Sequence, residues 1–356
     1  MVEERIVYAK ESAWSKAQAK MDRLRELTSR PHWPRMLCNI LLCRLSVRLH
    51  TARSLGKPYF LMIEPSALCN LRCPLCPTGE GTLRREVGNM SFATFRRIID
   101  DLAGALMEIV FTNYGEPYLN PDLNRMIRYA KARGVTVIVG TNGHYFHTEA
   151  AVAGVLRSGV DRLYVSLDGA CQETYQQYRV RGDFQRVVDG LKRLIDARHQ
   201  RRLKAPFVEL QFLVMRHNET EIDRMRALAE EIGVDRLVLK SVSFNNADWH
   251  RPEVRRRFLD FVPTDPAYQL YEVEGEQLRW RRPVTDACDY LWRASVVLWD
   301  GRIVPCCLDP RAEMVMGHVE EGFTRVWNNP RYRRLRRRVV RHKASIPLCA
   351  NCLGMT

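Results

Sequence analysis

The chain has 356 residues, a formal net charge of +15 and 11 cysteines. This length suits about two domains, and a hydrophobic content of 46% supplies a core and excludes global disorder. The longest apolar stretch, residues 36–43, falls far below the roughly 20 residues of a spanning helix, and the acidic N-terminus lacks the features of a secretory signal. We therefore expect a cytoplasmic protein, in which clustered cysteines indicate metal or redox chemistry before a disulfide framework.

The N-terminal extension, residues 1–57, is basic and is expected to be helical, with a break around Pro31 and Pro34 and no strand. The stretch 36–50 is amphipathic and flanked by bases, which suits a helix lying on the inner surface of a membrane. A helix that covers the rest of the fold is the more ordinary explanation of this pattern. Peripheral membrane contact through this helix is therefore kept as an alternative.

Residues 58–244 alternate short apolar runs with amphipathic segments. The expected strands are 59–66, 107–115, 135–143, 162–169, 206–215 and 236–244, and the expected helices between them include 92–102, 122–133, 149–157, 184–198 and 221–232. Such alternation predicts right-handed crossovers and a parallel sheet that is covered on both faces. Because the unit is short for an eightfold barrel, the expected fold is α/β, a partial (β/α)6 TIM-like barrel with its active groups at the C-terminal strand ends.

The rest of the chain lacks this alternation of short apolar runs and amphipathic segments. Residues 245–287 are rich in proline and arginine, predict no regular element, and are expected to supply substrate contacts. Residues 288–356 predict a small α+β domain, in which Asp300-Gly301 between apolar runs indicates a β-hairpin. A basic helix is expected over 324–341.

Three cysteines directly follow the first strand, in Cys69-Asn-Leu-Arg-Cys73-Pro-Leu-Cys76. Three thiolates within eight residues can converge on one metal centre. A structural zinc ion takes four protein ligands, and no fourth Cys or His lies nearby in the sequence. Three ligands leave one position open for a small molecule, whereas the ordinary alternative is three cysteines packed in a loop.

This spacing after the first strand resembles that of the radical S-adenosylmethionine (SAM) superfamily. The resemblance implies a [4Fe–4S] cluster held by Cys69, Cys73 and Cys76, whose open iron binds SAM and whose electron cleaves it to a 5′-deoxyadenosyl radical. It also implies that this radical abstracts a hydrogen atom from a substrate, and that a flavodoxin- or ferredoxin-type protein is the reductant.

Other strand ends carry the same resemblance. Gly115 and Glu116, in Tyr-Gly-Glu-Pro, are similar to the element that receives the methionine amino group of SAM. Ser166 and Asp168 resemble the segment that hydrogen-bonds the ribose. Residues 141–143 are expected to line the same opening of the barrel, at the C-terminal ends of its strands. Each signal alone is ordinary turn chemistry, and it is their order along the strands that supports the resemblance.

Arg179 is similar in position to the arginine that pairs with the methionine carboxylate of SAM, and Arg181 is a rival for this role. Leu75 departs from the family pattern, because many members have an aromatic residue just before the third cysteine. A leucine can still pack against adenine, so this departure is read as variation within the family.

The second set of cysteines is Cys288, Cys306, Cys349 and Cys352. Their order resembles the Twitch form of the SPASM extension, which implies one auxiliary [4Fe–4S] cluster with four protein ligands. A four-cysteine zinc site is the alternative. If the strand continues through the adjacent pair, Cys307 should point to the opposite face, so only one of the two is expected to be a ligand.

Four cysteines are left over, namely Cys38, Cys43, Cys171 and Cys307. Such cysteines are usually small buried hydrophobes. By their positions, Cys171 or Cys307 is a candidate donor of a hydrogen atom to a substrate radical.

The cysteine order resembles that of 2-deoxy-scyllo-inosamine dehydrogenase, which implies oxidation or epimerisation of a small molecule such as a sugar or cyclitol. The alternatives within the class are a peptide maturase and an enzyme that modifies lipids or the cell envelope. From another class, a zinc-stabilised nucleic-acid-binding protein would use the basic run 331–343. No nucleic-acid-binding fold is visible, so nucleic acid is not an expected partner.

Overall fold

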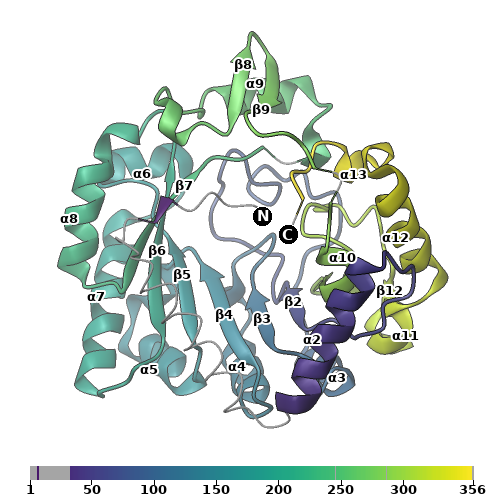
Figure 1. Cartoon of the computed structure of the whole chain (residues 1–356). Coiled ribbons are helices and arrows are strands. Elements are labelled where there is room, and N and C mark those ends of the chain that lie inside the picture. Colours follow the sequence, from purple (N-terminus) through teal and green to yellow (C-terminus); the bar gives the residue numbers. More distant parts are fainter. Residues whose placement is uncertain (1–5, 8–32, 245, 286, 355–356) are drawn as a thin grey trace, which may run out of the picture.

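The computed structural model of the chain describes residues 6–7, 33–244, 246–285 and 287–354. Its main sheet has ten strands in the order β1-β7-β6-β5-β4-β3-β2-β10-β11-β12. From β7 to β2 all neighbours are parallel, and the strands curve around an interior with helices outside (Figure 1). The expected α/β class and partial (β/α)6 barrel are thereby confirmed.

The barrel elements follow the expected order. Its strands are β2 (Phe60–Ile63), β3 (Glu108–Phe111), β4 (Thr136–Thr141), β5 (Arg162–Ser166), β6 (Phe207–Val214) and β7 (Arg236–Ser241). Its helices are α3 (Phe92–Asp101), α4 (Leu123–Lys131), α5 (Glu149–Ser158), α6 (Gln172–Tyr178), α7 (Phe184–Gln200) and α8 (Ile222–Ile232). The six strands and five of these helices lie where the sequence predicts them, and the short α6 is additional.

Alternation along each strand separates two environments. In β2, Leu61 and Ile63 are fully buried in the core beneath the helices, whereas Phe60 and Met62 face the barrel interior. The helix ends follow local chemistry as well: Gly233 closes α8 in the left-handed region at φ +80°, where a side chain would be strained.

The two ends of the barrel sheet are extended by distant segments. The two-residue β1 (Ile6–Val7) pairs antiparallel with β7, although no strand is expected in the N-terminal extension. At the other end, β10 (Ala294–Val297) pairs in parallel with β2. The expected hairpin is confirmed as β10 and β11 (Arg302–Val304), followed by β12 (Gly317–His318). The C-terminal domain therefore continues the barrel sheet.

The expected basic helix 324–341 is in fact two helices, α11 (Phe323–Trp327) and α12 (Pro330–His342). The chain breaks between them because the Asn329 side chain accepts a hydrogen bond from the Tyr332 N–H at 3.0 Å, and Pro330 occupies the first turn. The short helices α10 (Tyr290–Arg293) and α13 (Pro347–Ala350) complete this domain.

The stretch 246–285 is more regular than the sequence indicates. It contains α9 (Pro252–Leu259) and an antiparallel hairpin of β8 (Tyr271–Glu274) and β9 (Gln277–Trp280), which projects at the top of Figure 1. Aromatic contacts hold it, with Trp249 stacked on Trp280 at 6.2 Å between ring centroids. Because these rings are irregularly spaced in the sequence, no periodic pattern reveals them.

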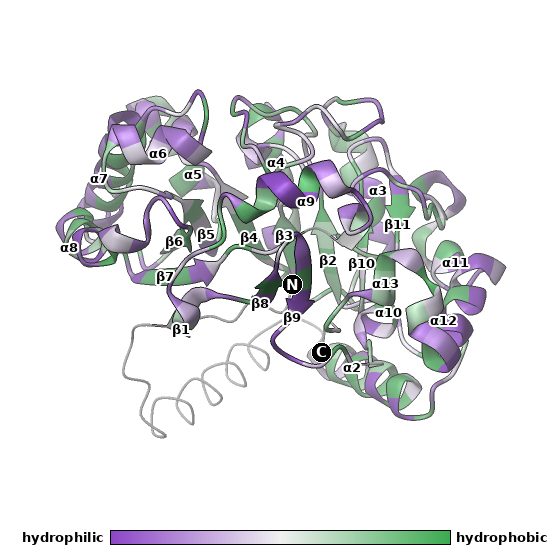
Figure 2. Ribbon diagram, turned by 90° about the horizontal axis from the view of Figure 1, so that it is seen from above, coloured by the Kyte–Doolittle hydropathy of each residue, from purple (hydrophilic) through white to green (hydrophobic). Residues whose placement is uncertain are grey.

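In the N-terminal extension, α2 (Trp33–Arg48) packs against α10, and the remaining expected helices lie outside the described residues. Figure 2 shows α2 at the edge of the molecule with apolar and polar residues mixed along its length. Among the described helices, none is both long and apolar enough to cross a bilayer.

The short 3-10 turns are Pro117–Leu119, His144–His147, Glu219–Glu221, Asn246–Asp248, Pro266–Tyr268, Val319–Glu321 and Lys343–Ser345.

Candidate functional site

The barrel interior holds a cavity of about 640 Å³, within the range of about 300–1,000 Å³ typical of small-molecule sites. Cys69, Cys73 and Cys76 all lie in its wall. Four of the five residues that the resemblance assigns to SAM also line it, namely Gly115, Glu116, Ser166 and Arg179. The structure thus brings to one place side chains from four separate loops and strand ends.

Burial changes the acidity of two of these thiols. Desolvation raises the pKa of Cys69 to about 12 and also raises the pKa of Cys73. Gly79 keeps the loop compact, because a Cβ there would lie 2.4 Å from the carbonyl oxygen of Cys73. Buried thiols that converge on a cavity suit a thiophilic metal, which replaces their protons on binding.

Gly115 brings the end of β3 against the loop after β2. It adopts φ +152°, and a Cβ would lie 2.0 Å from the carbonyl oxygen of Ser66, so another residue would force the loops apart. The neighbouring Glu116 is buried and accepts hydrogen bonds from the Thr141 hydroxyl at 2.7 Å and the Asn142 N–H at 2.8 Å. Burial raises the pKa of Glu116 despite these bonds.

Arg179 and Asp168 form a nearly buried ion pair, with Arg179 Nε 2.5 Å from Asp168 Oδ2. Arg179 Nη1 also lies 3.7 Å from the Cys73 sulfur. Asp168 is not part of the cavity wall: its other oxygen accepts from the Leu213 N–H at 2.7 Å, so it anchors Arg179 from behind. The rival Arg181 is exposed and lies outside the wall.

A chain of amides links the cysteine loop to the strand ends, and sequence reasoning missed it. Asn142 Nδ2 donates to Asn70 Oδ1 at 2.8 Å, while Asn142 Oδ1 lies 3.1 Å from Nδ1 of His144. His144 Nε2 accepts from the Asp183 N–H at 2.9 Å, and burial lowers the pKa of this histidine. Of the expected Thr141-Asn142-Gly143 segment, Thr141 and Asn142 line the cavity and Gly143 does not, while Asn142 also orients the cysteine loop.

A second unpredicted feature is the ion pair of Glu64, which directly follows β2, with Arg85. Arg85 Nη1 and Nη2 donate to the two carboxylate oxygens at 2.9 and 2.6 Å, and both side chains are almost fully buried. Arg85 Nε also donates to the Pro310 carbonyl at 2.7 Å, which ties the barrel to the C-terminal domain. An acid at the end of an apolar strand is the one sequence signal for this site; its partner cannot be found from spacing.

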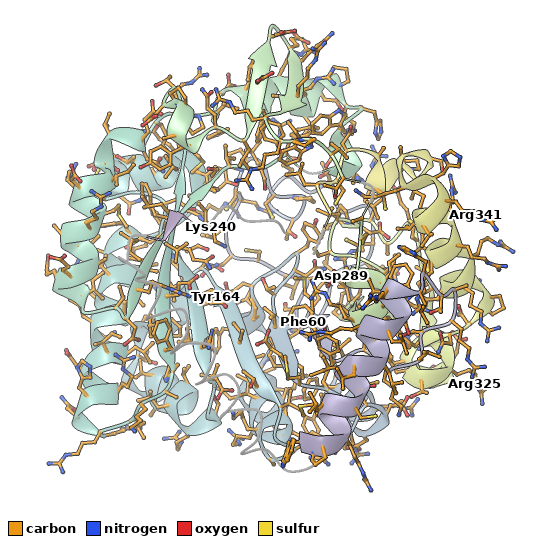
Figure 3. The ribbon with its side chains drawn as sticks, in the orientation of Figure 1. Phe60, Tyr164, Lys240, Asp289, Arg325 and Arg341 are labelled. Carbon is orange, nitrogen blue, oxygen red and sulfur yellow. The ribbon has the colours of Figure 1, made fainter. Side chains whose placement is uncertain are left out.

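The wall away from the cysteines mixes apolar side chains with charged groups of both signs. Phe60, Tyr164 and Lys240, which are labelled in Figure 3, line it from β2, β5 and β7. Glu108 and Arg293 also belong to this wall. None of the described residues in 246–285 contributes to the cavity, so the substrate contacts expected from that stretch are not found here.

The second set of cysteines lines a smaller pocket of about 30 Å³. Its wall contains all four expected thiols, Cys288, Cys306, Cys349 and Cys352, amid apolar side chains. Burial raises the pKa of Cys349 to about 12 and that of Cys288. Cys307 is buried outside this wall, so only one of the adjacent pair lines it, although β11 ends at Val304 and does not continue through the pair. Among the described residues, no three His, Cys, Asp or Glu side chains lie close enough to hold a single metal ion.

Lys343 places a positive charge beside these four thiols. Its side chain is part of the pocket wall and is only 2% exposed. The ammonium donates to the backbone carbonyls of Thr285 and Cys352, the latter at 2.5 Å. A buried cation favours nearby thiolates, and it lowers the pKa of Cys349 against the larger effect of burial.

The two pockets share Tyr290, which lines both of them. Its hydroxyl is buried and has no hydrogen-bond partner among the described residues. By contrast, Cys171 and Cys307 lie outside the wall of the barrel cavity, so neither is placed to meet a substrate there.

Comparison with known proteins places this geometry in a family. The radical SAM superfamily matches residues 63–230, and the SPASM iron–sulfur cluster-binding domain matches residues 288–353. The mycofactocin maturase MftC of Mycobacterium tuberculosis is 31% identical over 327 residues, which cover 84% of this chain and 77% of that protein.

Two further similarities span most of the chain. A tungsten-containing aldehyde ferredoxin oxidoreductase cofactor-modifying protein of Pyrococcus furiosus is 24% identical over 317 residues, covering 82% of this chain and 86% of that protein. The structure of Streptococcus suis SuiB bound to SAM has a TM-score of 0.57 at 16% identity, covering 90% of this chain and 78% of SuiB, and supports the fold alone.

The C-terminal match decides between the two interpretations of the second cysteine set, because it is to an iron–sulfur domain and not to a zinc site. The cofactors that these two domains carry are SAM with its [4Fe–4S] cluster and an auxiliary iron–sulfur cluster. This chain therefore belongs to the radical SAM superfamily, as an enzyme with a C-terminal SPASM domain.

Proposed function

We propose that the chain is a radical SAM oxidoreductase in which Cys69, Cys73 and Cys76 hold the SAM-binding [4Fe–4S] cluster. The observation that carries this proposal is that these thiols share one cavity with Gly115 and Arg179. When bound together, the cluster and SAM supply a 5′-deoxyadenosyl radical that takes a hydrogen atom from the substrate. The electron for SAM cleavage comes from a flavodoxin- or ferredoxin-type protein.

In this proposal the residues of the wall position SAM. Arg179, held by Asp168, pairs with the methionine carboxylate. The close approach at Gly115 and the buried Glu116 leave the methionine ammonium among acceptors, and the Ser166 hydroxyl faces the ribose. The enclosed barrel keeps water away from the reacting atoms.

The proposed substrate is a small polar molecule such as a sugar or cyclitol, which the enzyme oxidises or epimerises at a hydroxylated carbon. The wall away from the cysteines supports this, because Glu108, Lys240, Arg293 and Tyr164 offer charges and hydrogen-bonding groups among its apolar side chains. In the same proposal Cys288, Cys306, Cys349 and Cys352 would hold one auxiliary cluster, which would supply an acceptor for the electron that the substrate loses when it is oxidised.

A peptide substrate is the second candidate. The 31% identity to MftC, which is a maturase, favours it, and SuiB has been solved bound to its precursor peptide. The two candidates share the SAM chemistry and differ only in the substrate that contacts the cavity wall away from the cysteines.

The cluster assignment is tested on anaerobically reconstituted protein, which should hold about eight irons per chain for two [4Fe–4S] clusters. A Cys69→Ser variant should lose about half of the iron and all formation of 5′-deoxyadenosine. A Cys288→Ser variant should lose the other half and still cleave SAM. Cys171→Ser is the matched control and should resemble the wild type; full iron content in the first two variants would overturn the assignment.

The substrate class is tested by isotope transfer. The enzyme is incubated with SAM and extracts from cells grown on deuterated sugar or, separately, on deuterated amino acids. Deuterium should enter 5′-deoxyadenosine with the sugar-labelled extract, in its low-molecular-weight fraction. Transfer only from the peptide fraction of the amino-acid-labelled extract would replace the small-molecule proposal with the peptide one.

A further inference from the structure

The outward face of α2, together with the residue that follows it, carries a row of large apolar side chains. Trp33, Leu37, Leu41, Leu45 and Leu49 recur every four residues, and between 37% and 59% of each is exposed. We call these five residues the leucine ridge. The opposite face of α2 is already buried in the protein through residues such as Met36, Ile40 and Cys43. A helix that only covers a fold has one apolar stripe, and α2 has a second one facing outward.

The sequence around the ridge contains no acid. Between Glu26 and Glu64 there are six Arg and Lys residues and no Asp or Glu. After Glu321 the chain contains nine Arg and Lys residues and again no acid up to its last residue. The net charge of +15 is therefore concentrated in two segments far apart in the sequence.

The fold brings these two segments together. The loop after α2 accepts hydrogen bonds from the C-terminal domain, with Trp327 Nε1 2.9 Å from the Gly56 carbonyl and Arg336 Nη1 3.3 Å from the Ala52 carbonyl. Figures 1 and 2 both place α2 and α12 at the same corner of the molecule. Figure 3 shows Arg325 and Arg341 projecting outward there.

The exposed bases flank the ridge on both elements. Arg44 and Arg48 are exposed on α2 beside the leucines. Six arginines are exposed on α12, namely Arg331, Arg333, Arg334, Arg337, Arg338 and Arg341. An apolar row beside a dense positive field is the arrangement of helices that lie in a membrane interface.

We infer that this corner docks on an anionic lipid surface, with the leucine ridge at the boundary of headgroups and acyl chains and the arginines on lipid phosphates. The charges favour this occupant over the others. A second copy would bring two positive corners together, and residues 8–32 have six bases against three acids, so both carry the same sign as the corner. Nucleic acid would leave the apolar ridge against phosphates.

The test is co-sedimentation of the full reconstituted chain with vesicles of phosphatidylcholine alone or with added phosphatidylglycerol. Binding should require phosphatidylglycerol and weaken with salt. The double variant Leu41→Glu/Leu45→Glu should lower binding at least tenfold. Replacing Arg337 and Arg341 by Gln should lower it by about fivefold per arginine. Leu203→Glu, at an equally exposed leucine away from this corner, is the matched control and should bind like the wild type.

The variants should keep the wild-type melting temperature and SAM cleavage, so that a loss of binding reports the surface alone. Wild-type binding by the ridge variant would overturn the inference. Vesicle binding that appears only after residues 1–32 are deleted would also overturn it, because that segment would then be the occupant of the ridge. So would a dimer that forms without lipid and dissociates in the Leu41→Glu/Leu45→Glu variant, because a second copy would then be the occupant. Equal binding to phosphatidylcholine alone would contradict the role of the arginines.

Discussion

Tyr290 and Phe60 meet edge to face, with ring centroids 6.3 Å apart, in the wall between the barrel cavity and the second cysteine pocket. Tyr290 belongs to both walls, whereas Phe60 faces the barrel alone. Burial, and then the nearby thiols of Cys307 and Cys306, raise the pKa of Tyr290. One aromatic side chain therefore separates the proposed site of hydrogen abstraction from the proposed auxiliary cluster.

A Tyr290→Phe variant should be more stable than the wild type when both proteins lack clusters. The buried hydroxyl has no partner among the described residues, so its removal should add about 1 kcal/mol to the free energy of unfolding. Denaturant unfolding measures this. Tyr332→Phe is the control: its hydroxyl lies 2.7 Å from the Ser295 hydroxyl, so its loss should destabilise the protein.

In cluster-loaded protein we expect the Tyr290 hydroxyl to donate a hydrogen bond to a sulfur of the auxiliary cluster. Because hydrogen bonds to cluster sulfurs favour the reduced form, the Tyr290→Phe change should make the midpoint potential of this cluster more negative. A redox titration followed by electron paramagnetic resonance measures the shift. An unchanged potential would mean that the hydroxyl does not reach the cluster.

An Arg179→Lys variant should bind SAM about 10- to 100-fold more weakly in the reconstituted enzyme. Lysine keeps the charge and loses the fork that lets one guanidinium contact both Asp168 and a carboxylate. Calorimetric titration with SAM gives the dissociation constant. Arg181→Lys is the matched control two residues away, exposed and outside the cavity wall, and should bind like the wild type. Weaker binding by Arg181→Lys with unchanged binding by Arg179→Lys would make Arg181 the SAM contact instead.

An Arg85→Met variant should lose about 3–5 kcal/mol of stability, because it leaves the buried Glu64 carboxylate without its cation. The double variant Glu64→Gln/Arg85→Met should recover part of this loss, since it removes both charges. The exposed pair Lys192 and Glu231 is the comparison, and breaking it should cost far less stability because solvent screens it. Urea unfolding of the four proteins decides the point; a double variant no more stable than Arg85→Met would contradict the argument.

His144 should make the protein less stable in mild acid. Burial lowers its pKa below the model-peptide value of 6.5, so the folded protein binds this proton less readily than the unfolded chain. Its stability contribution is therefore complete above pH 6.5 and is lost as the pH falls through the folded value. The protonated ring also cannot accept from the Asp183 N–H.

The unfolding free energy of the wild type should accordingly fall as the pH drops below 6.5. A His144→Gln variant should show a smaller slope, and a further His217→Gln change should reduce it again, because burial lowers the pKa of His217 too. The exposed His50 is the control. A slope that does not change in the double variant would place the acid sensitivity elsewhere.

Local patterns in the sequence predicted the barrel well. Each barrel strand is a short apolar run and each covering helix repeats apolar residues every three or four positions, so both can be read without knowing the neighbours. The cysteines and glycines of the site were found for a similar reason, since Cys69, Cys73, Cys76 and Gly115 lie at strand ends with a fixed spacing.

The missed features all depend on partners distant in the sequence. Ala294–Val297 looks like a buried strand, but no local signal tells that β2 is its neighbour. Glu64 pairs with Arg85 only through the fold. The contacts of Asp168 with Arg179 and with the Leu213 N–H on another strand likewise have no signal in the local sequence. The role of Asp168 as an anchor of Arg179 follows from this tertiary contact.

The pairing of β2 with β10 also orders events during synthesis. Ile63 and its partner Val297 are 234 positions apart, so β2 and the cysteine loop leave the ribosome long before the strand that completes their sheet. Until then the backbone N–H and C=O groups along one edge of β2 are unpaired, so this edge can associate with other nascent chains. Maturation of the first cluster should therefore wait for the C-terminal domain, and a barrel fragment made alone should be hard to keep in solution.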